Sequence, residues 1–204
     1  MALLFFDNFD GADANPIGSP YTTVTAAGAD VRRNNNLAKG STDATRSIAR
    51  ISTITLPARH RVEVTGGSLT LDTADSIRIG VIAGYRTSDG AFVYFGADTA
   101  GTIYLGQFTG SFFLTEQASA AYTYTTGDTL SLEVQADGAL IGRVNGTTIL
   151  TGSWTAGGLS GSPGDQGGIW VRGLTSELQS VALYSYETFN PLSGRGGGAA
   201  QPLV

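Results

Sequence analysis

The stretch that decides the fold covers residues 76–96 and reads SIRIGVIAGYRTSDGAFVYFG. Apolar side chains fall on every second position here, with Ile82 as the one exception, and a period of two is typical of a β-strand. The turn residues Thr87-Ser88-Asp89-Gly90 follow, and then an aromatic, β-branched run at 91–95. The sequence therefore predicts a β-hairpin at the centre of a sheet. The residues predicted to share one face of its first strand are Ile77, Ile79, Val81, Ala83 and Tyr85.

Similar strand and turn patterns continue along the chain. Residues 130–136 alternate between apolar and polar, and the tight-turn pairs Asp137-Gly138 and Asn145-Gly146 predict a three-stranded meander. No segment has the sustained period of 3.6 residues that indicates an amphipathic helix. The chain has 204 residues, of which 41% are hydrophobic and 29 are glycine. We predict one all-β domain over residues 1–190, a two-sheet antiparallel β-sandwich of the jelly-roll type.

The composition changes at the C-terminal end of the chain. Residues 191–204 read PLSGRGGGAAQPLV. A segment so rich in glycine and so poor in large apolar residues cannot form a core element. We expect a C-terminal extension that is either flexible or docked on a partner.

The bulk composition excludes several classes of protein. The net charge of −5 and the pI of about 4.7 disfavour a nucleic-acid partner, which usually needs a basic face. No apolar run approaches the ~18 residues of a membrane helix. The first six residues carry no basic side chain, so we expect no secretion by a signal peptide. The absence of cysteine excludes disulfides and thiolate metal sites.

The order of these strand and turn patterns resembles that of concanavalin A-like (laminin G-like) jelly-roll domains. The segments that carry the resemblance are a central hairpin at 77–95, an L-x-V strand at 130–135, a v-d-G hairpin at 142–147, a G-x-x-G-hydrophobic strand at 164–170 and a closing strand at 181–186. The resemblance covers residues 3–187 and implies two curved antiparallel sheets with neighbouring termini. Lectins, glycanases, adhesion modules and virion proteins share this fold, so the function must be argued from a site.

The sequence contains no catalytic motif. The glucanases of this fold carry E-x-D-x-x-E on one strand, and a retaining mechanism needs two carboxyl groups about 5–5.5 Å apart. None of the glutamates here has an acid two or three residues away. The single histidine, His60, lies between two arginines and is interpreted as a surface residue, and no G-x-S-x-G motif occurs. We expect no enzyme activity. The glutamates are Glu63, Glu116, Glu133, Glu177 and Glu187.

One acidic segment is a candidate metal site. Asp7, Asn8, Asp10 and Asp13 fall within seven residues, and calcium prefers such oxygen ligands. The spacing resembles the start of an EF-hand loop, but no glutamate closes it at the twelfth position. Two interpretations stay open: a calcium site, or a solvated turn after a strand. Apart from this calcium ion, we expect no cofactor.

Arginine and aromatic side chains are the candidate contacts for a glycan or a protein partner. Arg78 and Arg86 lie on the outward face of the predicted hairpin, with Tyr94 beside them. Trp154 and Trp170 complete the predicted contacts, because exposed rings stack on sugars. Half-buried aromatic residues are equally ordinary in a sandwich, so a packing role stays open for each of them. The full set of aromatic candidates is Trp154, Trp170, Tyr85, Tyr94, Tyr104, Tyr122 and Tyr124.

Two functions are compatible with these features. The main prediction is a non-enzymatic structural protein of a virion, because low charge, many small residues and a glycine-rich tail resemble bacteriophage decoration, head-fibre and tail proteins. Such a protein is made in the host cytoplasm, and its partners are other virion subunits or further copies of itself. The alternative is a lectin-like carbohydrate-binding or adhesion module that recognises glycans of a host surface.

Overall fold

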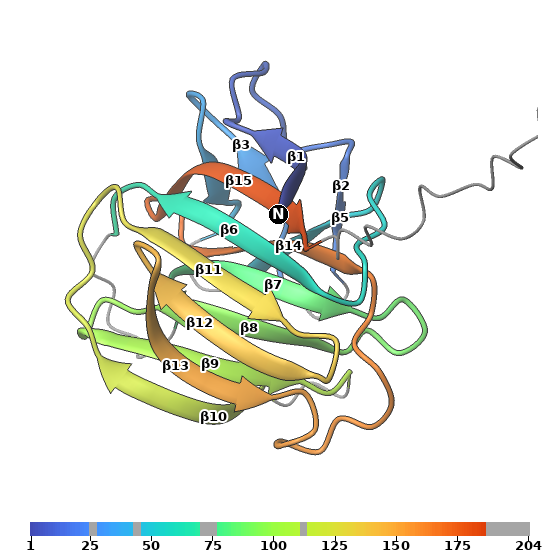
Figure 1. The fold of residues 1–204 in the computed structure, drawn as a ribbon. Helices are drawn as coiled ribbons and strands as arrows, with labels where there is room; N and C mark the ends of the chain where they lie inside the picture. The colour runs from blue at the N-terminus through green and yellow to red at the C-terminus, as the bar shows by residue number, and fades with distance from the viewer. Residues whose placement is uncertain (25–27, 43–45, 70–76, 111–113, 187–204) are drawn as a thin grey trace, which may run out of the picture.

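The computed structural model describes residues 1–24, 28–42, 46–69, 77–110 and 114–186. These residues form fifteen β-strands and no helix. The strands make two antiparallel sheets that pack face to face (Figure 1). The predicted all-β sandwich is therefore confirmed. The predicted C-terminal extension, residues 191–204, lies outside the described residues, and the domain boundary at residue 190 stays a prediction.

Sheet I has eight strands. Seven of them follow one another in a linear order, and the eighth, β1 (Ala2–Asp7), pairs with one strand of that series. In sheet order the other strands are β13 (Thr147–Ser153), β12 (Ala139–Val144), β11 (Thr129–Val134), β6 (His60–Gly66), β15 (Glu177–Ser185), β4 (Ala38–Gly40) and β3 (Val31–Arg33).

Sheet II has seven strands and carries the predicted hairpin in its middle. In sheet order they are β10 (Leu114–Ala121), β9 (Thr102–Phe108), β8 (Phe92–Ala97), β7 (Ile79–Tyr85), β14 (Gln166–Arg172), β5 (Arg46–Ile51) and β2 (Tyr21–Thr23).

One hydrophobic core fills the space between the two sheets. Val62 and Val64 of β6 meet this core from sheet I, and Ile79 and Val81 of β7 meet it from sheet II. All four are at most 1% exposed, and burial of each such side chain stabilises the fold by roughly 1.5–3 kcal/mol. Buried and half-buried residues alternate along β6, as the period of a strand requires.

Strands β7 and β8 form the predicted hairpin. Ile79 is opposite Ala97, and Ala83 is opposite Val93. Gly90, in the turn between the strands, has a φ of 73°, which glycine adopts without the steric cost of a Cβ atom. Every residue of the two strands is buried, and β14 and β9 flank them in the sheet. The hairpin is central, as predicted.

The predicted common face of the first strand is wrong at its two ends. Positions 79, 81 and 83 face the main core, but Ile77 and Tyr85 belong to a second cluster on the outer face of sheet II. Gly84 has a φ of 62°, and this left-handed residue interrupts the alternation before Tyr85. Ile82, the exception in the sequence pattern, is a member of the same outer cluster. The outer cluster consists of Val24, Ile48, Ile77, Ile82, Tyr85, Phe92, Tyr94, Phe108 and Trp170.

Strands β11, β12 and β13 form the predicted meander. Asn145 and Gly146, between β12 and β13, have φ values of 49° and 80°. A two-residue hairpin turn of this type needs both central residues in the left-handed region, which explains the Asn-Gly pair.

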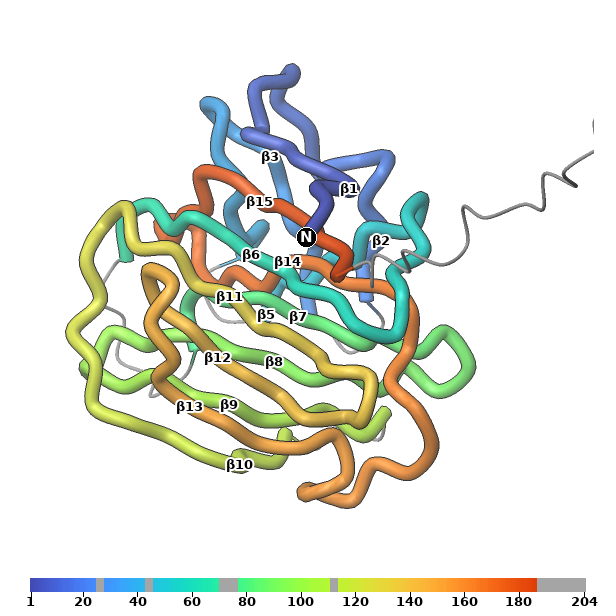
Figure 2. Tube along the Cα trace, viewed as in Figure 1, coloured from blue at the N-terminus to red at the C-terminus, as the bar shows by residue number. Residues whose placement is uncertain are grey.

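The start of the chain and its last described strand lie together. Ala2 of β1 is opposite Ser185 of β15, and Figure 2 shows the two segments side by side in blue and red. The neighbouring positions agree with what the resemblance implied for the two ends of the domain.

Candidate functional site

A row of four residues on the outer face of sheet II forms the centre of the candidate site. Trp170 of β14 is opposite Gly80 of β7, which is itself opposite Gly96 of β8. Gly96 is in turn opposite Tyr104 of β9. Directly opposed residues of antiparallel strands point their side chains to the same face. Two aromatic side chains therefore stand on either side of two positions that have no side chain.

Close contacts require both glycines. A Cβ atom on Gly80 would lie 2.5 Å from the carbonyl oxygen of Phe95. A Cβ atom on Gly96 would lie 2.6 Å from Cγ2 of Ile77 and 2.5 Å from the carbonyl oxygen of Ile79. Such distances are far inside van der Waals contact, so neither position can carry a side chain of its own. The Ile77 side chain packs onto Gly96 instead.

Tyr94 of β8 adds a third ring to this face. Its ring centroid lies 5.4 Å from that of Trp170, and the two planes are inclined by 51°. Gly106 of β9 is opposite Tyr94, and a Cβ atom there would lie 2.3 Å from the Tyr94 hydroxyl oxygen. The glycine therefore leaves the space that the Tyr94 side chain occupies.

These three rings line a groove of about 400 Å³, which we call the aromatic groove. Two of its charged residues, Arg46 of β5 and Arg172 of β14, belong to adjacent strands. The third, Glu116 of β10, belongs to the strand at the other end of the sheet. The residues that line the aromatic groove are Arg46, Ile77, Tyr94, Tyr104, Leu114, Glu116, Trp170 and Arg172.

The lining residues differ in how far a ligand can reach them. Trp170 and Tyr94 are 1% and 4% exposed, so they form the packed wall of the groove. Tyr104, Arg46 and Arg172 are half-buried, and Glu116 is exposed. The half-buried and exposed side chains are therefore the ones that can contact a ligand directly.

The two groove tyrosines are held in their neutral form. Burial, with the nearby Glu116 carboxylate as a second cause, raises the pKa of Tyr94 to about 12. Burial also raises the pKa of Tyr104, together with the hydrogen bond that its hydroxyl donates to Oδ2 of Asp98 at 2.8 Å. Both rings therefore stay uncharged at neutral pH.

The aromatic groove contains only two of the five predicted contact residues. Tyr94 and Trp170 meet in the aromatic groove. Arg78 directly precedes β7, and its side chain is only 1% exposed rather than presented outward. The role of these residues as ligand contacts stays a prediction.

The other two predicted contacts lie away from the aromatic groove. Arg86 pairs with Asp89, and its guanidinium lies 5.3 Å from the centroid of the Trp154 ring. Trp154 is 1% exposed and lines a separate hollow of about 130 Å³.

Sequence reasoning did not select three charged residues of the groove. Arg46, Glu116 and Arg172 belong to no motif. In the sequence, 125 residues lie between Arg46 and its opposite partner on β14, Arg172. Tyr104 was among the aromatic candidates but not among the five predicted contacts. The pairing of β5 with β14 is what joins Arg46 to the site, and such long-range pairing leaves no local pattern in the sequence.

Two of the four predicted calcium ligands accept hydrogen bonds from different parts of the fold. Asp7 accepts hydrogen bonds from the Phe9 N–H at 2.7 Å and the Tyr21 hydroxyl at 2.8 Å. Asp13 instead accepts one from the Asn35 N–H at 2.9 Å. Within the described residues, no three His, Cys, Asp or Glu side chains gather as they would around a metal ion. Calcium binding by Asp7, Asn8, Asp10 and Asp13 stays a prediction.

His60 is not a surface residue, contrary to the interpretation from the sequence. It is 0% exposed, because as the first residue of β6 it shares the inward face with Val62 and Val64. Its Nδ1 lies 2.7 Å from the carbonyl oxygen of Pro57. Burial lowers the pKa of His60, despite the opposing effects of that hydrogen bond and of Asp165.

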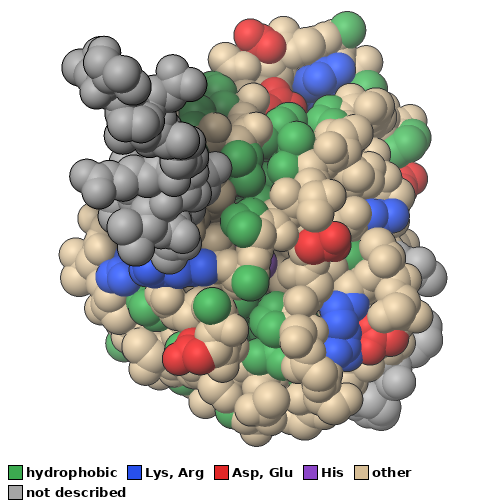
Figure 3. Space-filling view, turned by 45° about the vertical axis from the view of Figure 1, so that its right-hand side comes forward, with side chains coloured by type: hydrophobic (Ala, Val, Ile, Leu, Met, Phe, Trp, Pro, Cys, Tyr) green, Lys and Arg blue, Asp and Glu red, His purple; other side chains and the backbone are tan. Residues whose placement is uncertain are grey.

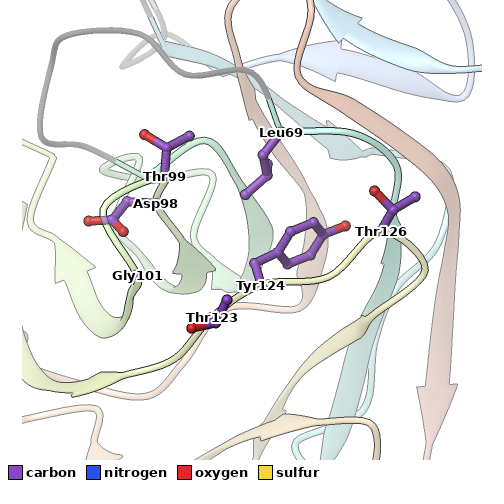
Figure 4. Close-up of a pocket in the computed structure, with 7 residues that line it drawn as sticks. All are labelled: Leu69, Asp98, Thr99, Gly101, Thr123, Tyr124 and Thr126. Atoms are coloured by element: carbon purple, nitrogen blue, oxygen red, sulfur yellow. The ribbon is translucent and has the colours of Figure 1, made fainter.

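A second cavity, the end pocket, has a volume of about 230 Å³. Figure 4 shows Leu69 and Tyr124 in its middle, with Asp98 and Thr99 on one side and Thr126 on the other. Two of its polar side chains are used within the protein: the Tyr124 hydroxyl donates to the Gly67 carbonyl at 2.8 Å, and Asp98 accepts from two backbone N–H groups and from a tyrosine.

The charged side chains do not form a surface of a single sign on the face shown in Figure 3. Lys and Arg appear there in groups that are interspersed with groups of Asp and Glu. A nucleic-acid binder would show a broad basic stripe.

No helix long and apolar enough to cross a membrane occurs in the described part of the chain.

No family model and no curated protein matches the chain. Solved structures do match it over most of its length. The potassium-bound carbohydrate recognition domain of Emp46p has a TM-score of 0.56 and 13% identity, and the match covers 89% of this chain and 95% of that one. The carbohydrate-binding module CBM66 from Bacillus subtilis has a TM-score of 0.57 and 14% identity, with 81% and 96% covered.

The exoplasmic/lumenal domain of VIP36, bound to Ca²⁺ and Man3GlcNAc, is a third similar structure. Its TM-score is 0.55 at 9% identity, and the match covers 85% of this chain and 87% of that one. These likenesses show a concanavalin A-like β-sandwich of the kind found in lectins. At such low identity they show the fold alone.

The main functional prediction from the sequence, a structural protein of a virion, is wrong in the light of these likenesses. The similar structures are carbohydrate recognition and carbohydrate-binding domains. They give no support to virion subunits as partners or to a relationship with bacteriophage proteins. They support the alternative, a carbohydrate-binding module.

Proposed function

We propose that the protein binds carbohydrate in the aromatic groove, without catalysing a reaction. The observation that carries the proposal is the row in which Trp170 and Tyr104 flank two glycines, with Tyr94 beside them. The hollow between the rings has about 400 Å³, which is within the range of small-molecule sites. The lectin-like fold supports the same conclusion.

The groove offers both kinds of contact that a sugar ring uses. The half-buried ring of Tyr104 presents an apolar surface to the C–H groups of a pyranose. Arg46 and Arg172 can donate hydrogen bonds to sugar hydroxyls, and the carboxylate of Glu116 can accept them.

The carboxylates of the groove do not suit hydrolysis. Glu116 is the only acidic residue among the described residues that line it. A glycosidase of the usual kind needs two carboxyl groups, about 5–5.5 Å apart in a retaining enzyme. Binding without turnover is therefore the function that the groove supports.

A glycan array followed by titration calorimetry tests the proposal. We expect the protein to bind at least one class of glycan, and Tyr104→Ala to weaken that binding about fivefold or more, because stacking on a ring contributes on the order of 1 kcal/mol or more. The matched control is Tyr184→Ala, which removes a partly buried tyrosine from sheet I and should leave binding unchanged.

Two outcomes contradict the proposal. One is the absence of any bound glycan at millimolar concentration. The other is equal loss of binding in both tyrosine variants, which would place the site elsewhere or indicate general unfolding. Thermal melts of both variants distinguish these two causes.

A further inference from the structure

We propose that the ligand is an acidic saccharide, whose carboxylate or sulfate group is held by Arg46 and Arg172 while its ring lies toward Tyr104. This inference rests on the proposed function and specifies its ligand class. The two arginines are directly opposite each other on β5 and β14. Both line the aromatic groove, so the pair presents two positive charges at the same place.

The opposition of two arginines concentrates positive charge at this end of the groove. Directly opposed residues of antiparallel strands have Cβ atoms about 4.5–5.5 Å apart, and like charges at that spacing destabilise the sheet. Both side chains are half-buried, so water screens them less than it screens exposed groups. An anionic group bound between them would remove the repulsion.

Arg46 differs from four other arginines of the fold, which have a carboxylate partner. Arg59 and Arg143 pair with Glu133, Arg61 pairs with Glu63, and Arg86 pairs with Asp89. No ion pair joins Arg46 to a carboxylate in the part of the chain that the structure describes. The groove's own acid, Glu116, is on β10, five strands from β5 in the sheet order.

The geometry of the groove places a sugar ring next to this charged end. Trp170 shares β14 with Arg172, two residues away, and the row of Trp170, Gly80, Gly96 and Tyr104 leads from it across the sheet.

Arginine suits this role better than lysine. Its planar guanidinium donates two parallel hydrogen bonds to a carboxylate or sulfate. Such charge-assisted bonds give a preference on the order of tenfold to a hundredfold over a neutral group. We therefore expect the acidic form of a glycan to bind at least tenfold more tightly than its neutral counterpart.

The experiment compares matched pairs of ligands. Oligogalacturonate and its methyl ester share one skeleton and differ in the carboxylate charge, and a heparin oligosaccharide and its desulfated form differ in sulfate. A glycan array with neutral, uronate-bearing, sialylated and sulfated members widens the search. We expect an acidic glycan to bind, its affinity to fall when the acid is esterified or removed, and added salt to weaken the complex.

Variants on one strand locate the charge. Arg46→Gln should weaken binding of the acidic glycan at least tenfold, and Arg46→Lys should lie between it and the unmodified protein. The control is Arg50→Gln, which lies on the same strand and face but contacts Gln166 and the Tyr85 ring outside the groove. It should bind as the unmodified protein does.

The outcomes separate this inference from the proposed function. Binding of neutral glycans alone, or equal binding of an acid and its ester, overturns the inference and leaves carbohydrate binding in place. Equal effects of Arg46→Gln and Arg50→Gln in folded variants also overturn it. If no glycan of any class binds, the proposed function fails as well.

Discussion

His60 shows how one residue links the core to the pH of the solution. The unfolded chain binds a proton on histidine near pH 6.5, but burial lowers the pKa of His60 in the folded protein. Between these two pKa values the unfolded state binds more protons, so its stability relative to the folded state increases as the pH falls. The contribution of neutral His60 is therefore fully present above pH 6.5 and is lost below it.

We expect the free energy of unfolding to fall between pH 7 and pH 5, with a slope of up to about 1.4 kcal/mol per pH unit. His60 is the only histidine of the chain, so His60→Gln should remove most of this slope even if it lowers stability overall. Urea unfolding at several pH values measures both proteins. The same slope in the two would show that His60 does not cause it.

Gly80 is a second single residue on which the fold depends. Because it has no Cβ atom, strands β7 and β8 can approach each other closely at this point. A methyl group there would lie 2.5 Å from the Phe95 carbonyl oxygen and 2.9 Å from the Cα of Gly96. Neither backbone atom can move without disturbing the central hairpin. We expect Gly80→Ala to lower the free energy of unfolding by about 1–3 kcal/mol, as overpacking of a core does.

Ser119→Ala is the control for Gly80→Ala in denaturant unfolding. Ser119 belongs to the same row of the sheet, opposite Tyr104, and is exposed. Its replacement should change stability by no more than about 0.5 kcal/mol. Equal stability of Gly80→Ala and the unmodified protein would contradict the close approach of β7 and β8.

At the scale of the element, the central hairpin was predictable and the use of its two faces was not. The alternation of residues 77–85 and the turn ending in Gly90 indicate the strands correctly. Tyr85 lies on the other face because Gly84 adopts a positive φ, and a glycine in a strand does not reveal its dihedral angles in the sequence. Ile82 broke the alternation for a physical reason: the outer face of β7 is buried as well.

The aromatic groove depends on pairings between elements that are distant in the chain. Tyr94 and Trp170 could be selected from the sequence as aromatic candidates, but not as neighbours. Arg46 joins them only because β5 pairs with β14, and β14 with β7. The same limit explains His60, whose two flanking arginines suggested a charged surface, whereas the pleat of β6 turns His60 inward.

At the scale of the whole molecule, all fifteen described strands come before the C-terminal extension in the sequence. The last described strand, β15, ends at Ser185 and pairs with β6, β4 and β1. We expect a chain that ends at residue 190 to keep the melting temperature of the full chain, because all fifteen described strands are retained. Circular dichroism measures this. A lower melting temperature in the shortened chain would place the domain boundary beyond residue 190.

The glycine pair in the middle of the groove has a consequence for how the protein can change over time. Backbone contacts require glycine at positions 80 and 96, where β7 and β8 approach each other beneath the groove. Arg46, Tyr104 and Glu116 line the groove from three different strands and take no part in that close approach of β7 and β8. Ligand preference can therefore diverge by substitution at these positions while the sheet beneath them is inherited unchanged.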